Sequence, residues 1–133
     1  MRFQTGVWER ETCLKMKQKQ LDGRQQVMRD FAEVAANRGQ HFFYVLIREP
    51  LAPSGRIDKY EAPLSAALGE LGKITGGGSQ LGEGATIAYC GIDVVVVDRD
   101  LGLQIIRKSL RACGAGDDTV IEENVPNYRA LTL

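Results

Sequence analysis

The stretch TIAYCGIDVVVVD, residues 86–98, carries a clear structural signal. Valine and isoleucine favour the extended backbone of a sheet, so we expect a strand here that ends near Asp98. Side chains along a strand alternate between its two faces. Both alternate sets in this stretch are largely apolar, with Asp93 as the one acid inside the run. The strand is therefore expected to be covered on both faces.

The run HFFYVLIRE at residues 41–49 predicts a second, central strand that ends before Pro50. Its alternate sets are also apolar, whereas a solvated antiparallel sheet shows polar residues at every second position. Something must cover the second face of this sheet. We expect one of three covers: the chain's own N-terminal helix through Met28, Phe31 and Val34, a second copy of the chain, or a partner protein.

Three segments show the three- and four-residue spacing of amphipathic helices. Their apolar faces are Val27, Met28, Phe31, Val34 and Ala35 within residues 22–38, Leu64, Ala67, Leu68 and Leu71 within residues 58–71, and Leu103, Ile106, Leu110 and Cys113 after Asp98. Pro53-Ser54-Gly55 predicts a turn before the second helix, and Pro63 falls in its first turn, where a missing N–H costs little. Asp98 is the expected N-cap of the third helix, which ends at Gly114.

A glycine-rich stretch, GGGSQLGEG at residues 76–84, separates a short strand at 73–75 from the long strand at 86–98. It lacks the spacing of a phosphate-binding loop and does not open a helix, so we expect a flexible or bulged hairpin loop. Residues 119–123 predict a fourth strand, and the tail that follows, with Pro126, is expected to be irregular. The order of elements from residue 41 is then β-α-β-β-α-β.

This order resembles the ferredoxin-like plait, an α+β fold in which two helices pack on one face of a four-stranded antiparallel sheet. The chain is also similar to small bacterial proteins of this plan. The resemblance implies a ferredoxin-like domain at residues 41–133, preceded by an N-terminal helical extension at residues 1–40. It is a resemblance of architecture, so it implies no catalytic residues.

Composition limits the function. The chain has 133 residues, of which 44% are hydrophobic and 26% charged, and its 17 basic residues balance its 17 acidic ones. No overall field attracts nucleic acid or an anionic membrane. Three cysteines without a CxxC pair, and no signal peptide or membrane span in the sequence, favour a cytoplasmic protein. We expect no cofactor and no metal ion.

Asp93 is the most informative polar residue, because a carboxylate in an apolar strand needs a partner or a raised pKa. It is expected either to pair with Arg48 on the neighbouring strand, to sit at a wet end of the sheet, or to act as a general base. The candidate binding set combines the tyrosines of the open sheet face and the glycine loop with this acid. Its members are Tyr44, Arg48, Gly76, Gly77, Gly78, Ser79, Gln80, Tyr89 and Asp93.

The nucleophiles give weaker signals. Cys90 and Cys113 lie on apolar faces and are expected in the core, while Cys13 is the better candidate for an exposed thiol. His41 is the only histidine, which excludes a multi-histidine metal site. Tyr44 and Tyr89 alone make a poor base-stacking platform, so RNA binding is not expected.

Two functions remain from the sequence. The first is a non-enzymatic protein-binding or regulatory domain that uses the open sheet face, the N-terminal extension, or both, to bind a second copy or a protein partner. The alternative is a small enzyme or ligand sensor with a site between the loop at Gly76–Gln80 and the sheet face.

Overall fold

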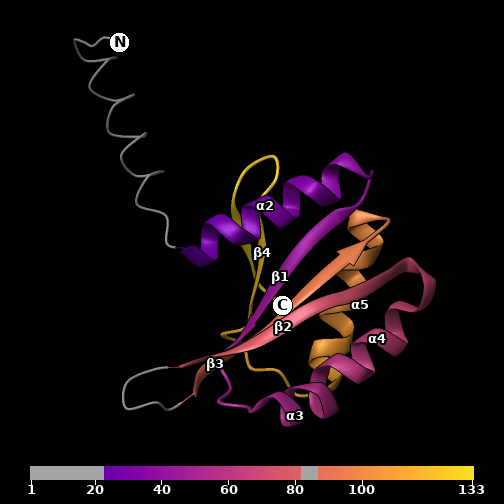
Figure 1. The fold of residues 1–133 in the computed structure, drawn as a ribbon. Helices are drawn as coiled ribbons and strands as arrows, with labels where there is room; N and C mark the ends of the chain where they lie inside the picture. Colours follow the sequence, from indigo (N-terminus) through magenta and orange to yellow (C-terminus); the bar gives the residue numbers. More distant parts are fainter. Residues whose placement is uncertain (1–22, 82–86) are drawn as a thin grey trace.

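The computed structural model describes residues 23–81 and 87–133, and Figure 1 shows the arrangement of their elements. The helices are α2 (Gly23–Asn37), α3 (Pro53–Arg56), α4 (Ala62–Leu68) and α5 (Arg99–Ala112), with a π-helical turn at Ile57–Glu61 and a 3-10 turn at Gly69–Leu71. The strands are β1 (His41–Ile47), β2 (Gly72–Leu81), β3 (Ile87–Val96), β4 (Val120–Glu123) and β5 (Arg129–Leu131). Predictions about Cys13 and about the ends of the glycine stretch and of the long strand, at 82–86, lie outside the described residues.

The strands form one antiparallel sheet in the order β2-β3-β1-β4-β5. The α+β prediction is confirmed, but the prediction of four strands is wrong, because the tail supplies β5. Main-chain pairing of Ile121 with Leu131 and of Glu123 with Arg129 makes this segment a strand. A three-residue strand at a sheet edge has too few side chains to produce a visible alternation in the sequence.

The prediction of a hairpin loop beginning at Gly76 is also wrong. Gly76, Gly77 and Gly78 belong to β2 and pair with Asp93, Ile92 and Gly91 of β3, with a register shift between Ile74 and Gly76. Glycine weakens strand propensity, but a sheet ladder uses only main-chain groups, and β3 supplies a continuous template for pairing. The expected bulge is present, inside the strand and not in a loop.

The connection after β1 turns helical at Pro53, earlier than the predicted start near Asp58. The path stays helical to Leu71, but its middle widens into a π turn in which the N–H of Ala62 donates to the carbonyl of Ile57. Pro63 has no N–H to donate and crowds the carbonyl four residues earlier. A wider turn just before a proline relieves that conflict, since π turns accommodate local breaks in the α-helical ladder.

The sheet has a hydrophobic core on each face. One core joins alternate residues of β1 and β3 to α4 and α5, with Phe43, Ile92, Leu64 and Ile106 fully buried. The other core joins the opposite residues of β1 to α2 through Met28, Ala32 and Ala35. The N-terminal helix therefore covers the second sheet face, the first of the three expected covers (Figure 1).

This cover is incomplete. Met28 is buried as expected, but Phe31 and Val34 are 46% and 49% exposed. Their side of α2 borders an uncovered part of the sheet near β2 and β3. The candidate functional site lies there.

Helix α5 begins as predicted. The Asp98 side chain accepts a hydrogen bond of 2.9 Å from the N–H of Leu101, and the helix ends before Gly114, whose φ of +86° suits glycine. Among the described residues, no helix has the length and apolar character needed to span a membrane.

Candidate functional site

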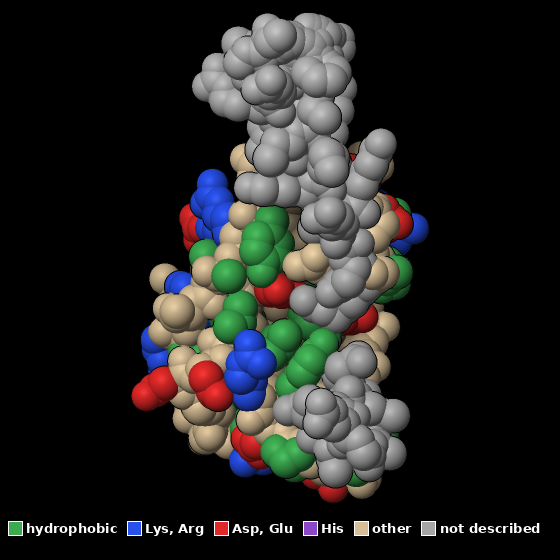
Figure 2. Space-filling view, turned by 90° about the vertical axis from the view of Figure 1, so that its left-hand side faces the viewer, with side chains coloured by type: hydrophobic (Ala, Val, Ile, Leu, Met, Phe, Trp, Pro, Cys, Tyr) green, Lys and Arg blue, Asp and Glu red, His purple; other side chains and the backbone are tan. Residues whose placement is uncertain are grey.

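A groove of about 450 Å³ lies between α2 and the part of the sheet formed by β2 and β3. Its apolar walls come from both layers: Phe31, Val34 and Ala35 from the helix, and Phe42 and Val95 from the sheet. The rings of Phe31 and Phe42 meet edge to face, with centroids 5.9 Å apart. Figure 2 shows hydrophobic side chains gathered on this side of the molecule, with acidic and basic groups among them.

The polar lining divides the groove into two ends. Lys73 is paired with Val95 in the β2–β3 register, and Arg38 and Gln40 precede β1 at the same end. Asp93 lies two residues from Val95 along β3, which is about 7 Å at the rise of a strand. The groove is therefore basic at one end and acidic at the other, and its walls are apolar.

Asp93 is half-buried, and its carboxylate has no hydrogen-bond or ion-pair partner in the part of the chain that the structure describes. Burial raises its pKa, the negative charge of Glu61 raises it further, and the positive charge of Arg56 opposes the shift. Gly76 makes room for this group, since a Cβ there would lie 3.0 Å from Oδ2 of Asp93. The site thus holds a carboxylate whose charge the described residues leave without a direct partner.

Arg48 is not placed to be that partner. Asp93 is opposite Tyr44 in the β1–β3 register, whereas Arg48 follows Ile47, which is opposite Cys90. Four residues of strand, about 13 Å, separate the two positions along the sheet. Arg48 is exposed at the far end of β1 and does not line the groove.

Tyr44 has a packing role in the described fold. It is 7% exposed, and its phenol lies across Gly91 of β3, where a side chain would overlap the hydroxyl and the ring. Tyr89 is half-buried and packs against the same core as Tyr44. Neither tyrosine lines the groove.

The glycine stretch is divided between the faces of the sheet. Gly77 leaves space for an ion pair on the α4 side, where Arg56 Nε and Glu61 Oε2 lie 3.1 Å and 2.9 Å from its absent Cβ. Ser79 and Gln80 continue β2 and pair with Cys90 and Tyr89 through their backbones. These residues form a strand beside the groove and not a loop over it.

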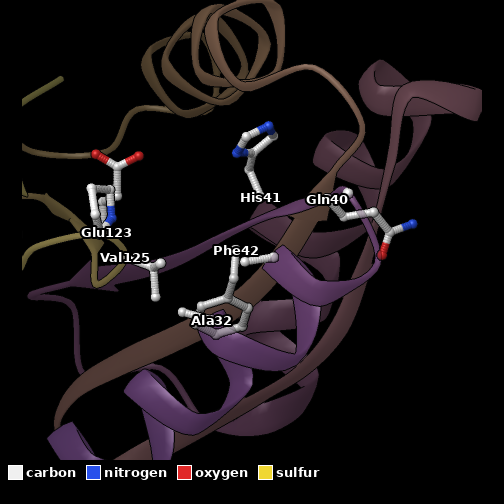
Figure 3. Close-up of a pocket in the computed structure, with 9 residues that line it drawn as sticks. Ala32, Gln40, His41, Phe42, Glu123 and Val125 are labelled. Carbon is white, nitrogen blue, oxygen red and sulfur yellow. The ribbon is translucent and has the colours of Figure 1, made fainter.

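A second cavity, of about 280 Å³, lies at the end of β1 (Figure 3). His41 and Phe42 point to opposite sides of the strand there, and Glu123 lies across from them. Glu123 already accepts two hydrogen bonds from Arg99, of 2.6 and 2.9 Å, so its charge is matched. The carboxylate of this cavity therefore has a charged hydrogen-bond partner, whereas Asp93 in the groove has none among the described residues.

The two cysteines expected in the core, Cys90 and Cys113, differ in burial. Cys90 is fully buried, and burial raises the pKa of its thiol, which lowers its reactivity. Cys113 is half-buried and lines a cavity of about 430 Å³ between α4 and α5. Within residues 23–81 and 87–133, no three His, Cys, Asp or Glu side chains come together as a metal site would require.

Sequence reasoning identified Asp93 but missed most of its neighbours in the groove. Lys73 and Thr75 belong to β2, whereas Arg38 and Gln40 belong to the turn between α2 and β1. These two segments come together only through the pairing of the strands and the packing of α2. A lysine near the start of a strand and an arginine after a helix have ordinary local roles, so neither produced a signal.

No family model matches this chain, and neither a curated protein nor a solved structure was found to match it.

Proposed function

We propose that this chain is a non-enzymatic binding domain and that the groove between α2 and β2–β3 receives a small ligand. The observation that carries the proposal is the combination of apolar walls with a half-buried carboxylate in a groove of about 450 Å³. Ligand sites have volumes of about 300–1,000 Å³ and combine an apolar lining with a few polar groups. This develops the ligand-sensor alternative from the sequence: Asp93 is kept from the predicted site, and α2 takes the place of the glycine loop.

A neutral apolar probe tests whether the groove binds at all. Titration of isotope-labelled protein with indole should shift the amide NMR signals of Phe31, Val34, Thr75 and Val95. Phe31→Ser should abolish these shifts. Ile57→Ser is the matched control, because Ile57 is 44% exposed on the opposite side of the sheet.

The proposal fails if indole shifts only signals between α4 and α5, or shifts none. Retained binding by Phe31→Ser would also place the probe outside the groove. Far-UV circular dichroism of both variants checks that the fold is intact.

A second candidate function, self-association, is supported by the exposed stripe on α2. Val27, Phe31 and Val34 follow one another at helical spacing and are each between 43% and 49% exposed. A solvated helix face is normally polar, and contiguous exposed apolar side chains mark interaction surfaces. The second copy of the chain expected from the sequence would dock here, along α2, and not on a bare sheet face.

Val27 separates the two candidates, because it belongs to the stripe but does not line the groove. If the stripe joins two copies, Val27→Ser should lower the mass measured by light scattering while indole binding persists. A wild-type chain that stays monomeric at all concentrations would exclude self-association and leave ligand binding untouched.

We also infer a ferredoxin-like plait for the part of the sheet that excludes β5. The supporting observations are the order β4-β1-β3-β2, the antiparallel pairing and the packing of α4 and α5 on the same face. A cytoplasmic location, expected from the cysteine pattern, belongs to the same proposal.

A further inference from the structure

The groove has a polarity that goes beyond ligand binding in general. Asp93 stands at one end with no described partner for its carboxylate, and Lys73 and Arg38 stand at the other. The β1–β3 register fixes this direction, because Asp93 is opposite Tyr44 while Val95, the partner of Lys73, is opposite Phe42. A ligand that matches the groove must present a positive group to its acidic end and a negative group to its basic end.

The acidic end requires a hydrogen-bond donor. A half-buried carboxylate without a partner is costly, because it loses water and gains no compensating bond. Lys73 is a diagonal neighbour of Asp93 across the β2–β3 pair, about 7–8 Å away between backbones, yet the described structure contains no ion pair between them. Thr75 Oγ1, 3.5 Å from the main-chain oxygen of Asp93, adds a hydroxyl beside this end.

The walls of the groove require an apolar body. The paired rings of Phe31 and Phe42 form one wall, and Val95, the register partner of Lys73, lies on the floor. A ring edge and an aliphatic floor suit an aromatic or branched aliphatic group.

We propose that the ligand is a small apolar zwitterion, such as an apolar α-amino acid, whose ammonium group donates to Asp93, whose carboxylate lies toward Lys73 and Arg38, and whose apolar side chain packs against Phe31 and Phe42. Its two charged groups share one carbon atom, so they lie together between the acidic and basic groups of the groove with the apolar side chain beside them. The proposal rests on the groove being the ligand site. An ammonium group offers three donors to the carboxylate of Asp93. The two exposed cations at the other end attract the ligand's carboxylate and orient the molecule.

Four probes with the same phenyl body test the assignment of each charge. Phenylalanine carries both charges, phenethylamine only the ammonium, hydrocinnamate only the carboxylate, and phenethyl alcohol neither. Binding is measured by calorimetry and by NMR titration of the full chain. Phenylalanine should bind at least about tenfold more tightly than any of the other three, since charge-assisted hydrogen bonds are the strong ones.

Two variants assign the ends separately. Asp93→Asn should weaken phenylalanine and phenethylamine by about tenfold to a hundredfold and leave hydrocinnamate unchanged. Lys73→Gln should weaken phenylalanine and hydrocinnamate and leave phenethylamine unchanged. Asp58→Asn and Lys108→Gln, which change the same charges at exposed positions outside the groove, should alter none of the affinities.

The outcomes separate this inference from the proposed function. If all four probes bind the groove equally, or if Asp93→Asn leaves phenylalanine binding unchanged, the zwitterion assignment is wrong although the groove remains a ligand site. If neither indole nor any phenyl probe shifts the groove signals, both proposals are wrong.

Discussion

Gly91→Ala is expected to lower the free energy of unfolding by about 1–3 kcal/mol, the range for overpacking a well-packed core. The reason is the position of Tyr44, whose phenol covers Gly91 across the β1–β3 pair. A Cβ at position 91 would overlap the hydroxyl and come within 2.7 Å of Cε1. Tyr44 is 7% exposed and packs in the core beneath α2, so it has little room to move.

Two responses to the added methyl group set this magnitude. Expelling the Tyr44 ring from the core would cost up to about 3–5 kcal/mol, as in the truncation of a buried aromatic side chain. A small shift of the strands costs about 1–3 kcal/mol, and the protein takes the cheaper response. With a urea slope of about 2 kcal/mol per molar, a loss of about 2 kcal/mol lowers the unfolding midpoint by about 1 M.

Gly78→Ala is the matched control, because Gly78 is the direct partner of Gly91 in the β2–β3 register. A Cβ at Gly78 meets no described atom within 4 Å. Removing a glycine from the unfolded chain stabilises by about 0.4–1 kcal/mol where no strain arises. The two substitutions are therefore expected to change the free energy of unfolding in opposite directions, as measured by urea unfolding followed by circular dichroism.

The cost must also depend on the tyrosine. In a Tyr44→Ala background, Gly91→Ala should cost almost nothing, since contacting residues couple in a double-mutant cycle. Equal effects of Gly91→Ala and Gly78→Ala, or additive effects of the two changes in the cycle, would refute the packing role assigned to Tyr44.

Three further predictions concern single side chains. Asp98→Ala should lower the free energy of unfolding by about 1 kcal/mol through loss of the α5 cap, whereas Asp117→Ala should change it little, as measured in urea. Burial and a hydrogen bond to Glu49 raise the pKa of Tyr60 to about 12, so the folded chain holds this proton more tightly than the unfolded chain, and stability should fall as pH rises above 10. Tyr60→Phe should remove this fall in stability and the tyrosinate absorbance that develops at the highest pH. An unchanged absorbance titration would contradict the raised pKa of Tyr60. Burial raises the pKa of Asp93, so ionisation of this carboxyl lowers the stability of the folded chain as pH rises. Asp93→Asn should therefore be more stable than wild type at neutral pH and equal to it below roughly pH 3, where the carboxyl is protonated in both the folded and unfolded states. A gap that is the same at every pH would count against a charge effect.

The candidate site was only partly predictable. Asp93 was visible because a lone acid in a valine-rich run is costly wherever the strand lies. The role of Tyr44 was not, since an exposed ring on a sheet face and a buried ring over a glycine have the same sequence pattern. The outcome depended on Gly91 being the diagonal neighbour of Tyr44, which is a matter of register.

Several local elements follow directly from sequence patterns that are strong over many residues. The apolar runs specified β1 and β3, the apolar stripe and the Asp98 cap specified α5, and the side chains of α2 specified a helix with one apolar face. Each of these follows from interactions within one segment, which is why the printed order of residues suffices. The double-sided apolar character of β1 and β3 also required a cover on the second face.

The part of the sheet that this cover leaves exposed depends on contacts between distant segments. Pairing with β3 places three glycines in a strand, and pairing with β4 makes the tail a strand, β5. The position of α2 on the sheet buries Met28 but leaves Phe31 and Val34 exposed along the groove that contains Asp93. These outcomes depend on main-chain pairing and side-chain packing between segments far apart in the chain. Such contacts have no periodicity in any one segment, so the groove and its two charged ends exist only in the folded molecule.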